Sequence, residues 1–172
     1  MSFTSSTVAI TKVNSAWEPI TSSTFPADGK SYMLTFDAHP AEAKKGRLAI
    51  EFLPESGAQA AGELQIRLDD RRAQFARGSL DIFAFPQKSL REGNSPQGVG
   101  NYSIENLIGV EDSFTVRVIV KNSEKMGGAL VDAEIAGQRT MISYRADLTV
   151  KKMIFRMEGM ELKNVQIAPL QE

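Results

Sequence analysis

The sequence of 172 residues contains no cysteine, one histidine and one tryptophan. The lack of cysteine excludes disulfide bonds, thiolate nucleophiles and the cysteine-ligated zinc and iron–sulfur sites. The single histidine, His39, excludes every metal site that needs two or more histidines. We interpret His39, which precedes Pro40, as a loop residue at a strand end, because no serine carries the glycine pattern of a nucleophile elbow.

An excess of charge is missing as well. Twenty basic and 21 acidic residues give a formal charge of −1, so the totals contain no electrostatic footprint for nucleic acid. No stretch approaches the roughly 20 apolar residues that span a membrane. The first residues lack a basic region followed by an apolar run and do not predict a signal peptide. We therefore expect a cytoplasmic protein or a module excised from a secreted one.

Alternation between apolar and polar residues is the main pattern that the sequence does contain. Such alternation predicts strands with one buried face. The clearest example is residues 63–69, where the even-numbered residues are apolar and predicted to face inward. The strands predicted in this way are residues 31–37, 47–53, 63–69, 114–120, 130–135, 139–144, 152–157 and 162–167, with 7–13 and 80–85 as further candidates.

Turn-forming residues separate these segments, as at Ala136-Gly137. Many strands separated by turns predict a single all-β domain over residues 1–172, a jelly-roll-like, two-sheet antiparallel β-sandwich. The best helical candidate is a turn or two near residues 40–45. The longest polar interruption is residues 87–100, which we interpret either as a functional loop or as a merely mobile one.

Three groups of charged residues are candidates for chemistry. Asp132 and Glu134 alternate along one strand and are predicted to share one face, as paired acids of a glycosidase or as a solvated surface. Glu111 and Asp112 are candidate calcium ligands through their carboxylate oxygens; no other cofactor is predicted. The run 68–72 contains two aspartates and two arginines, and predicts a polar binding patch or a self-paired hairpin tip.

The second half of the chain, residues 114–167, resembles the concanavalin A-like lectin and glucanase sandwich. The resemblance rests on the strand 114–120, on the strand pair around Ala136-Gly137 in the place of an Asn-Gly type turn, and on the closing strand 162–167. The layout is similar to the C-terminal sandwich of invertase-like glycoside hydrolases and to laminin-G-like modules. The acidic catalytic strand of the glucanases and the metal cluster of the legume lectins are absent from the sequence.

These observations favour a soluble, non-catalytic carbohydrate-binding or accessory module. Its partner would be a glycan, bound in a shallow groove on the outward faces of neighbouring strands. The residues predicted to line this groove are Arg67, Tyr102, Arg117, Asp132 and Arg139.

The first alternative is a structural or protein-interaction subunit, including a homo-oligomer. Met33, Ile119, Met153 and Phe155 cannot all lie on one inner face, so both faces of some strands are predicted to be apolar. The second alternative is a glycosidase or polysaccharide lyase that uses Asp132 and Glu134, or arginine and tyrosine side chains.

Overall fold

The computed structural model describes residues 6–7, 17–20, 31–54, 62–77, 102–123, 128–145 and 150–170. Side chains are described within 31–52, 62–75, 104–122, 130–138 and 153–170. The strand predicted at 80–85, most of the one at 7–13 and the polar segment 87–100 lie outside the described residues. Among the residues that are described, no helix is long and apolar enough to cross a membrane.

The described chain is all-β, as predicted, and its strands divide between two antiparallel sheets of six. Sheet A has the strand order β1-β12-β3-β8-β9-β10, and sheet B the order β2-β11-β4-β5-β6-β7. The strands are β1 (Ser6–Thr7), β2 (Trp17–Ile20), β3 (Ser31–Pro40), β4 (Arg47–Pro54), β5 (Gly62–Arg67), β6 (Arg72–Arg77), β7 (Tyr102–Ile104), β8 (Phe114–Ser123), β9 (Gly128–Ile135), β10 (Arg139–Arg145), β11 (Val150–Glu158) and β12 (Met160–Pro169).

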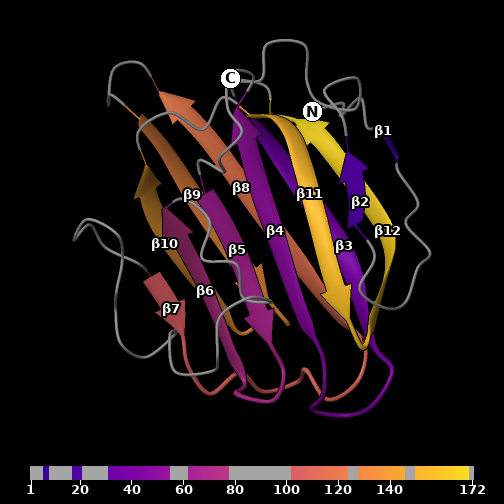
Figure 1. The fold of residues 1–172 in the computed structure, drawn as a ribbon. Helices are drawn as coiled ribbons and strands as arrows, with labels where there is room; N and C mark the ends of the chain where they lie inside the picture. Colours follow the sequence, from indigo (N-terminus) through magenta and orange to yellow (C-terminus); the bar gives the residue numbers. More distant parts are fainter. Residues whose placement is uncertain are drawn as a thin grey trace.

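The two sheets stack face to face, with β4 and β11 of sheet B in front of β3 and β8 of sheet A in Figure 1. Local hairpins such as β9–β10 and β5–β6 pair neighbours in sequence. Two other pairs join strands far apart in the chain, because β12 pairs with β3 and β11 pairs with β4. The last part of the chain therefore contributes one inner strand to each sheet, next to the short edge strands β1 and β2.

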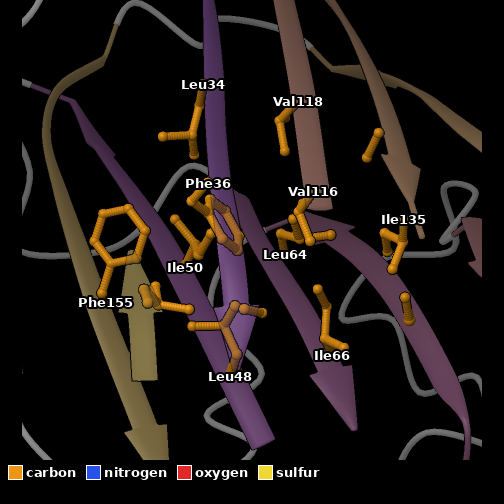
Figure 2. Close-up of a cluster of buried hydrophobic side chains, with 14 of the residues drawn as sticks. Leu34, Phe36, Leu48, Ile50, Leu64, Ile66, Val116, Val118, Ile135 and Phe155 are labelled. Atoms are coloured by element: carbon orange, nitrogen blue, oxygen red, sulfur yellow. The ribbon is translucent and has the colours of Figure 1, made fainter. Parts of the chain in front are cut away.

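Alternation along each central strand supplies one apolar residue in two to the space between the sheets. Leu34 and Phe36 of sheet A face Ile50, Leu64 and Phe155 of sheet B, and all of them are almost completely buried (Figure 2). The rings of Phe36 and Phe155 meet edge to face across the sandwich, with their centroids 6.3 Å apart. Burial of this apolar surface is the main term that holds the two sheets together.

Sequence analysis predicted that some strands are apolar on both faces. The four residues behind this prediction lie partly in the core and partly on the outer face of a sheet. Met153 and Phe155 lie in the core, whereas Met33 and Ile119 lie half-buried on the outer face of sheet A. Met33 and Ile119 are cross-strand partners in the β3–β8 ladder. The four residues therefore do not share one inner face, as predicted.

The short helical turn predicted near residues 40–45 is wrong. This segment is a tight turn that carries the chain from sheet A to sheet B, with a β-bridge and an ion pair between Glu42 and Lys45. Gly46 ends the turn with a φ of 135°, and it packs against Gly159, where the chain crosses back from β11 to β12. Both crossings meet at this corner, so the backbone geometry of the crossing prevailed over local helix propensity.

Candidate functional site

The outer face of sheet B, the face turned away from the core, carries a block of buried polar side chains. Glu63, Gln65 and Arg67 of β5 are at most 6% exposed, and so are Glu51 of β4 and Gln74 of β6. They are neighbours in the ladders, since Gln65 pairs with Gln74 and Glu63 with Glu51. Alternation placed the β5 residues on the outer face correctly, but such residues are ordinarily solvent-exposed.

Burial of this face decreases toward the β5–β6 hairpin tip. The Arg67 side chain is 7% exposed, and its Nη2 lies 3.0 Å from Asp69 Oδ2 and 3.3 Å from Asp70 Oδ2. The Asp69 side chain is already 42% exposed. The run 68–72 is thus a hairpin tip as predicted, but its charges pair with residues outside the run, Asp69 and Asp70 with Arg67 and Arg72 with Glu105. The polar block behind the tip opens to solvent at this end.

Four buried side-chain atoms in this block lack a hydrogen-bond partner within the described part of the chain. They are the amide oxygens of Gln65 and Gln74 and the Nε atoms of Arg67 and Arg72. Gln65 pairs with Gln74 and Arg67 with Arg72, so the four groups form one patch on two adjacent strands. A buried polar group without a partner costs about 1–3 kcal/mol, and such costs are concentrated at functional sites.

The partners that these groups require define the chemistry of the patch. An amide oxygen accepts a hydrogen bond, whereas an arginine Nε–H donates one. The Gln65 amide is fixed in orientation, because its Nε2 donates to Glu63 Oε1 over 2.7 Å and its oxygen points elsewhere. A ligand that both donates and accepts within a short distance, as neighbouring hydroxyl groups do, complements the patch.

Sequence analysis identified Arg67 in this patch but missed its neighbours. Gln65 was predicted to face outward without a role, and Gln74 was not singled out. The available signal was the hairpin itself, because folding residues 62–77 about Asp69-Asp70 brings polar positions of both strands into one column. Tyr102 lies on the next strand, β7, where it pairs with Phe75; its side chain is outside the described residues.

The other predicted groove residues belong to the other sheet. Arg117 lies on β8, Asp132 on β9 and Arg139 on β10, all in sheet A, whereas Arg67 and Tyr102 are in sheet B. The structure therefore divides the predicted groove between the two sheets. Arg139 pairs with Ile135 beside the hairpin turn, and its side chain is outside the described residues.

The polar residues of sheet A are paired and partly exposed. Arg117 Nη2 lies 2.7 Å from Glu134 Oε2, and the two side chains are 47% and 34% exposed. Glu134 and Asp132 share the outer face of β9, as alternation predicted. Burial raises the pKa of Asp132, the positive charge of Arg117 opposes this change, and the negative charge of Glu134 adds to it.

Glu111 and Asp112 lie in the segment between β7 and β8, where Asp112 is exposed and Glu111 half-buried. Calcium takes six to eight oxygen ligands in proteins. Nowhere in the described ranges do three acidic or histidine side chains gather closely enough to hold a metal ion. The two carboxylates are thus the full set of acidic ligands that the described residues offer at this position.

His39 is the next-to-last residue of β3, at a strand end as predicted. Its Nδ1 lies 2.6 Å from the hydroxyl of Ser113. A catalytic triad also needs a carboxylate on the second ring nitrogen. Among the described side chains no carboxylate is hydrogen-bonded to His39, so the contact lacks the third member of a triad.

Two sheets in this strand order, packed over a shared core, define a concanavalin A-like sandwich. No family model matches the sequence, and no curated protein matches it. Solved structures, in contrast, do match this chain. Galectin LEC-6 of Caenorhabditis elegans superimposes with a TM-score of 0.55 at 12% identity over 95% of this chain and 94% of its own. Sheep galectin-11 gives 0.57 at 11% identity over 91% and 98%.

Enzymes that contain a similar sandwich form the second group of structural neighbours. The fructofuranosidase of Schwanniomyces occidentalis gives a TM-score of 0.63 at 10% identity, and the match covers 98% of this chain and 33% of the enzyme. A fructosyltransferase of A. japonicus gives 0.60 at 17% identity over 98% and 27%. The chain thus spans about a third or less of these enzymes, and identities this low establish the fold alone.

Proposed function

We propose that this chain is a non-catalytic carbohydrate-binding module and that its glycan binds on the outer face of sheet B. The observation that carries the proposal is the patch of four unpartnered polar atoms on β5 and β6. Neighbouring hydroxyl groups of a sugar supply both the donors and the acceptors that this patch lacks.

The charges of the patch favour a neutral ligand. Arg67 is matched by Asp69 and Asp70, and Arg72 lies 3.2 Å from Glu105. The arginine charges are therefore already balanced, and their buried Nε–H groups remain for the ligand. The sugar enters from the hairpin tip, where the polar block meets solvent, and extends toward Gln65 and Gln74.

The structural neighbours support this proposal by their own ligands. The sheep galectin-11 structure is a complex with glycerol, and the Schwanniomyces enzyme is a complex with fructose. Both ligands are small polyols or sugars. These two proteins, each of which contains a similar sandwich, thus bind hydroxylated molecules, and the polar patch has the hydrogen-bonding groups to bind one in this chain.

The test is glycan binding by the purified chain and by two matched glutamine variants. A glycan array identifies the ligand, and calorimetry then measures its affinity. We expect Gln74→Leu, which keeps the side-chain volume, to weaken binding at least tenfold, because the amide oxygen is lost. Gln166→Leu makes the same change at an exposed position of sheet A, and we expect it to leave the affinity unchanged.

Several outcomes contradict the proposal. An array without a signal, or equal affinities for wild type and Gln74→Leu, removes the glycan from sheet B. Binding abolished by a calcium chelator transfers the site to Glu111 and Asp112, and the Glu111→Gln variant then tests that assignment. Hydrolysis of the bound glycan contradicts the non-catalytic role and directs attention to Asp132 and Glu134.

A protein-interaction role is the second candidate, and one observation favours it. Met33 and Ile119 are cross-strand partners on the outer face of sheet A, and Ala168 pairs with Met33 on the other side. The three side chains form an apolar row across β12, β3 and β8. Light scattering that shows a dimer, lost in a Met33→Ser, Ile119→Ser double variant, would favour this function; a monomer at every concentration would exclude self-association.

A further inference from the structure

A shallow hollow of about 330 Å³ lies on the outer face of sheet A, on the side of the sandwich opposite the sheet B patch. It is lined by residues of β8 and β9, of the segment between β7 and β8, and of the β9–β10 turn. Small-molecule sites in proteins measure roughly 300–1,000 Å³. The hollow is therefore large enough for one small ligand.

The rim of the hollow is held together by side-chain hydrogen bonds between two loops. The amide of Gln138, in the β9–β10 turn, accepts from Ile108 N over 2.9 Å and donates to Ile108 O. Gly109 and Gly137 lie beside these contacts with positive φ values of 70° and 65°. Since neither carries a side chain, the space between the two loops stays open.

The polar groups inside the hollow are fixed in position before any ligand arrives. Thr115 donates its hydroxyl hydrogen to Asp37 over 2.8 Å, and Asn164 holds the second Asp37 oxygen over 2.7 Å. These two hydrogen bonds, that from Asn164 first, lower the pKa of Asp37. The Thr115 oxygen consequently keeps its lone pairs for a donor in the hollow.

The remaining polar groups are restrained in a similar way. The Ser113 hydroxyl contacts His39 Nδ1 at 2.6 Å. Arg117 and Glu134 hold each other at 2.7 Å, and among the described residues that line the hollow they alone carry charged side chains. One positive and one negative charge cancel, while the guanidinium keeps spare N–H donors and the carboxylate keeps spare lone pairs.

We propose that this hollow is a second ligand site, which takes a neutral, polyhydroxylated unit of about one sugar ring. Hydroxyl groups donate to Glu134 and Thr115 and accept from Arg117, and the side chain of Ala136 contacts the carbon-bound hydrogens of the ring. The ring is either a free monosaccharide or one residue of a glycan. The site does not depend on the sheet B patch, because no residue is common to the two.

The test is nuclear magnetic resonance of the ¹⁵N-labelled chain, titrated separately with fructose, galactose and glucose, and with a disaccharide of each sugar that binds. We expect saturable shifts of the Gly109, Ser113, Thr115 and Gly137 amides. Thr115→Val keeps the side-chain shape and removes the hydroxyl, and we expect it to weaken this response at least tenfold. Gln166→Leu is the control, with an unchanged response.

The amide resonances that shift on titration distinguish this proposal from the one for sheet B, because the two sites lie on different strands. Gln74→Leu changes the response of β5 and β6 amides alone if both proposals hold, and failure at β5–β6 leaves the hollow standing. Tighter binding of the disaccharide assigns the hollow to a glycan residue, and equal binding assigns it to a free sugar; both support the site.

Three results overturn the second site. The first is the absence of a saturable shift at the hollow up to the solubility limit of all three sugars. The second is an equal affinity in wild type, Thr115→Val and Glu134→Gln. The third is tighter binding of galacturonate or glucosamine than of the neutral sugars, because a charged preference contradicts the balanced lining.

Discussion

The two sheets have similar inner faces but different outer faces. On sheet B, Gln65 is 1% exposed and its amide oxygen has no hydrogen-bond partner in the described part of the chain. On sheet A, Arg117 is 47% exposed and forms an ion pair with Glu134. Strand alternation is the same in both cases. The difference shows that alternation decides which face a side chain takes, whereas its solvent exposure depends on what lies over that face.

The largest difference in the free energy of unfolding between the two faces is expected when one partner of an ion pair is removed. On sheet B, Glu51 lies 3.4 Å from Arg156, and the side chains are 8% and 17% exposed. We expect Glu51→Ala to lower the free energy of unfolding by about 3 kcal/mol, since it breaks a largely buried ion pair. Glu134→Ala on sheet A should cost at most about 1 kcal/mol.

Urea denaturation followed by circular dichroism measures both values. The comparison depends on the difference between the two variants, because each removes one carboxylate from one cross-strand pair. Equal losses in the two variants would show that the faces do not differ in energy, and that the burial of the sheet B block has no energetic consequence.

The corner that joins the sheets is expected to give the next largest effect, and it affects both faces together. A Cβ at Gly46 would lie 2.7 Å from Met160 Cγ, at a φ of 135° that other residues rarely adopt. We expect Gly46→Ala to cost about 2 kcal/mol. Gly137→Ala, at a φ of 65° with nothing within 4 Å, should cost about 1 kcal/mol from the backbone alone.

Hydrogen exchange distinguishes the two glycine variants further. Gly46→Ala should lower the protection of β3 and β4, one strand of each sheet. The loss in Gly137→Ala should be confined to the β9–β10 hairpin. Protection lost in sheet B alone after Gly46→Ala would contradict the role of the corner in both sheets.

Local patterns in the sequence were sufficient for the strands β3 to β5 and β8 to β12 and for one hairpin, whereas β2, β6 and β7 were not predicted. Leu64 and Ile66 were assigned to the core by alternation, and Gly137 marked the β9–β10 turn, although Ala136 also takes a positive φ of 54° that alanine rarely adopts. The pairing of β12 with β3 was not predictable in this way. The register that joins Ile167 to Leu34 depends on a contact across most of the chain, and no local signal encodes it.

The candidate sites were predictable only in part, for the same reason. Arg67 and Arg117 were both assigned to outward faces, but nothing in their local sequence shows that they belong to different sheets. The hollow beside Arg117 also needs Gly109 and Gln138, which two separate loops contribute. Its residues are ordinary in sequence, and only the packing of these loops brings them together.

A smaller effect, with the opposite sign, is expected from the unpartnered amide of sheet B. Because the Gln74 oxygen is buried without a hydrogen bond in the described part of the chain, Gln74→Leu should raise the free energy of unfolding by about 1 kcal/mol. Gln166→Leu, at an exposed position of sheet A, should change it very little. Thermal and urea unfolding measure both. A clear loss of stability in Gln74→Leu would show that this amide is already satisfied.

The smallest effects are expected from two carboxylates that share the outer face of sheet A. Hydrogen bonds from Asn164 and Thr115 lower the pKa of Asp37 below its ordinary value of 3.8. The Asp37 carboxylate therefore stabilises the folded state fully above pH 3.8, and this contribution is lost as the pH falls through the lower, folded-state pKa. Asp37→Asn should cost less than about 1 kcal/mol at neutral pH, because the site is near the surface.

The Asp132 carboxylate, on the same face, is expected to affect stability with the opposite sign, because burial raises its pKa above 3.8. The folded state then binds the proton more tightly than the unfolded state, so stability falls as the pH rises from 3.8 through the folded-state pKa. Asp132→Asn removes this penalty and should gain less than about 1 kcal/mol at neutral pH. Unfolding free energies of both variants, measured from about pH 3 to pH 7, should diverge from wild type in opposite directions as the pH rises. Divergence in the same direction would show that burial does not control the Asp132 carboxylate.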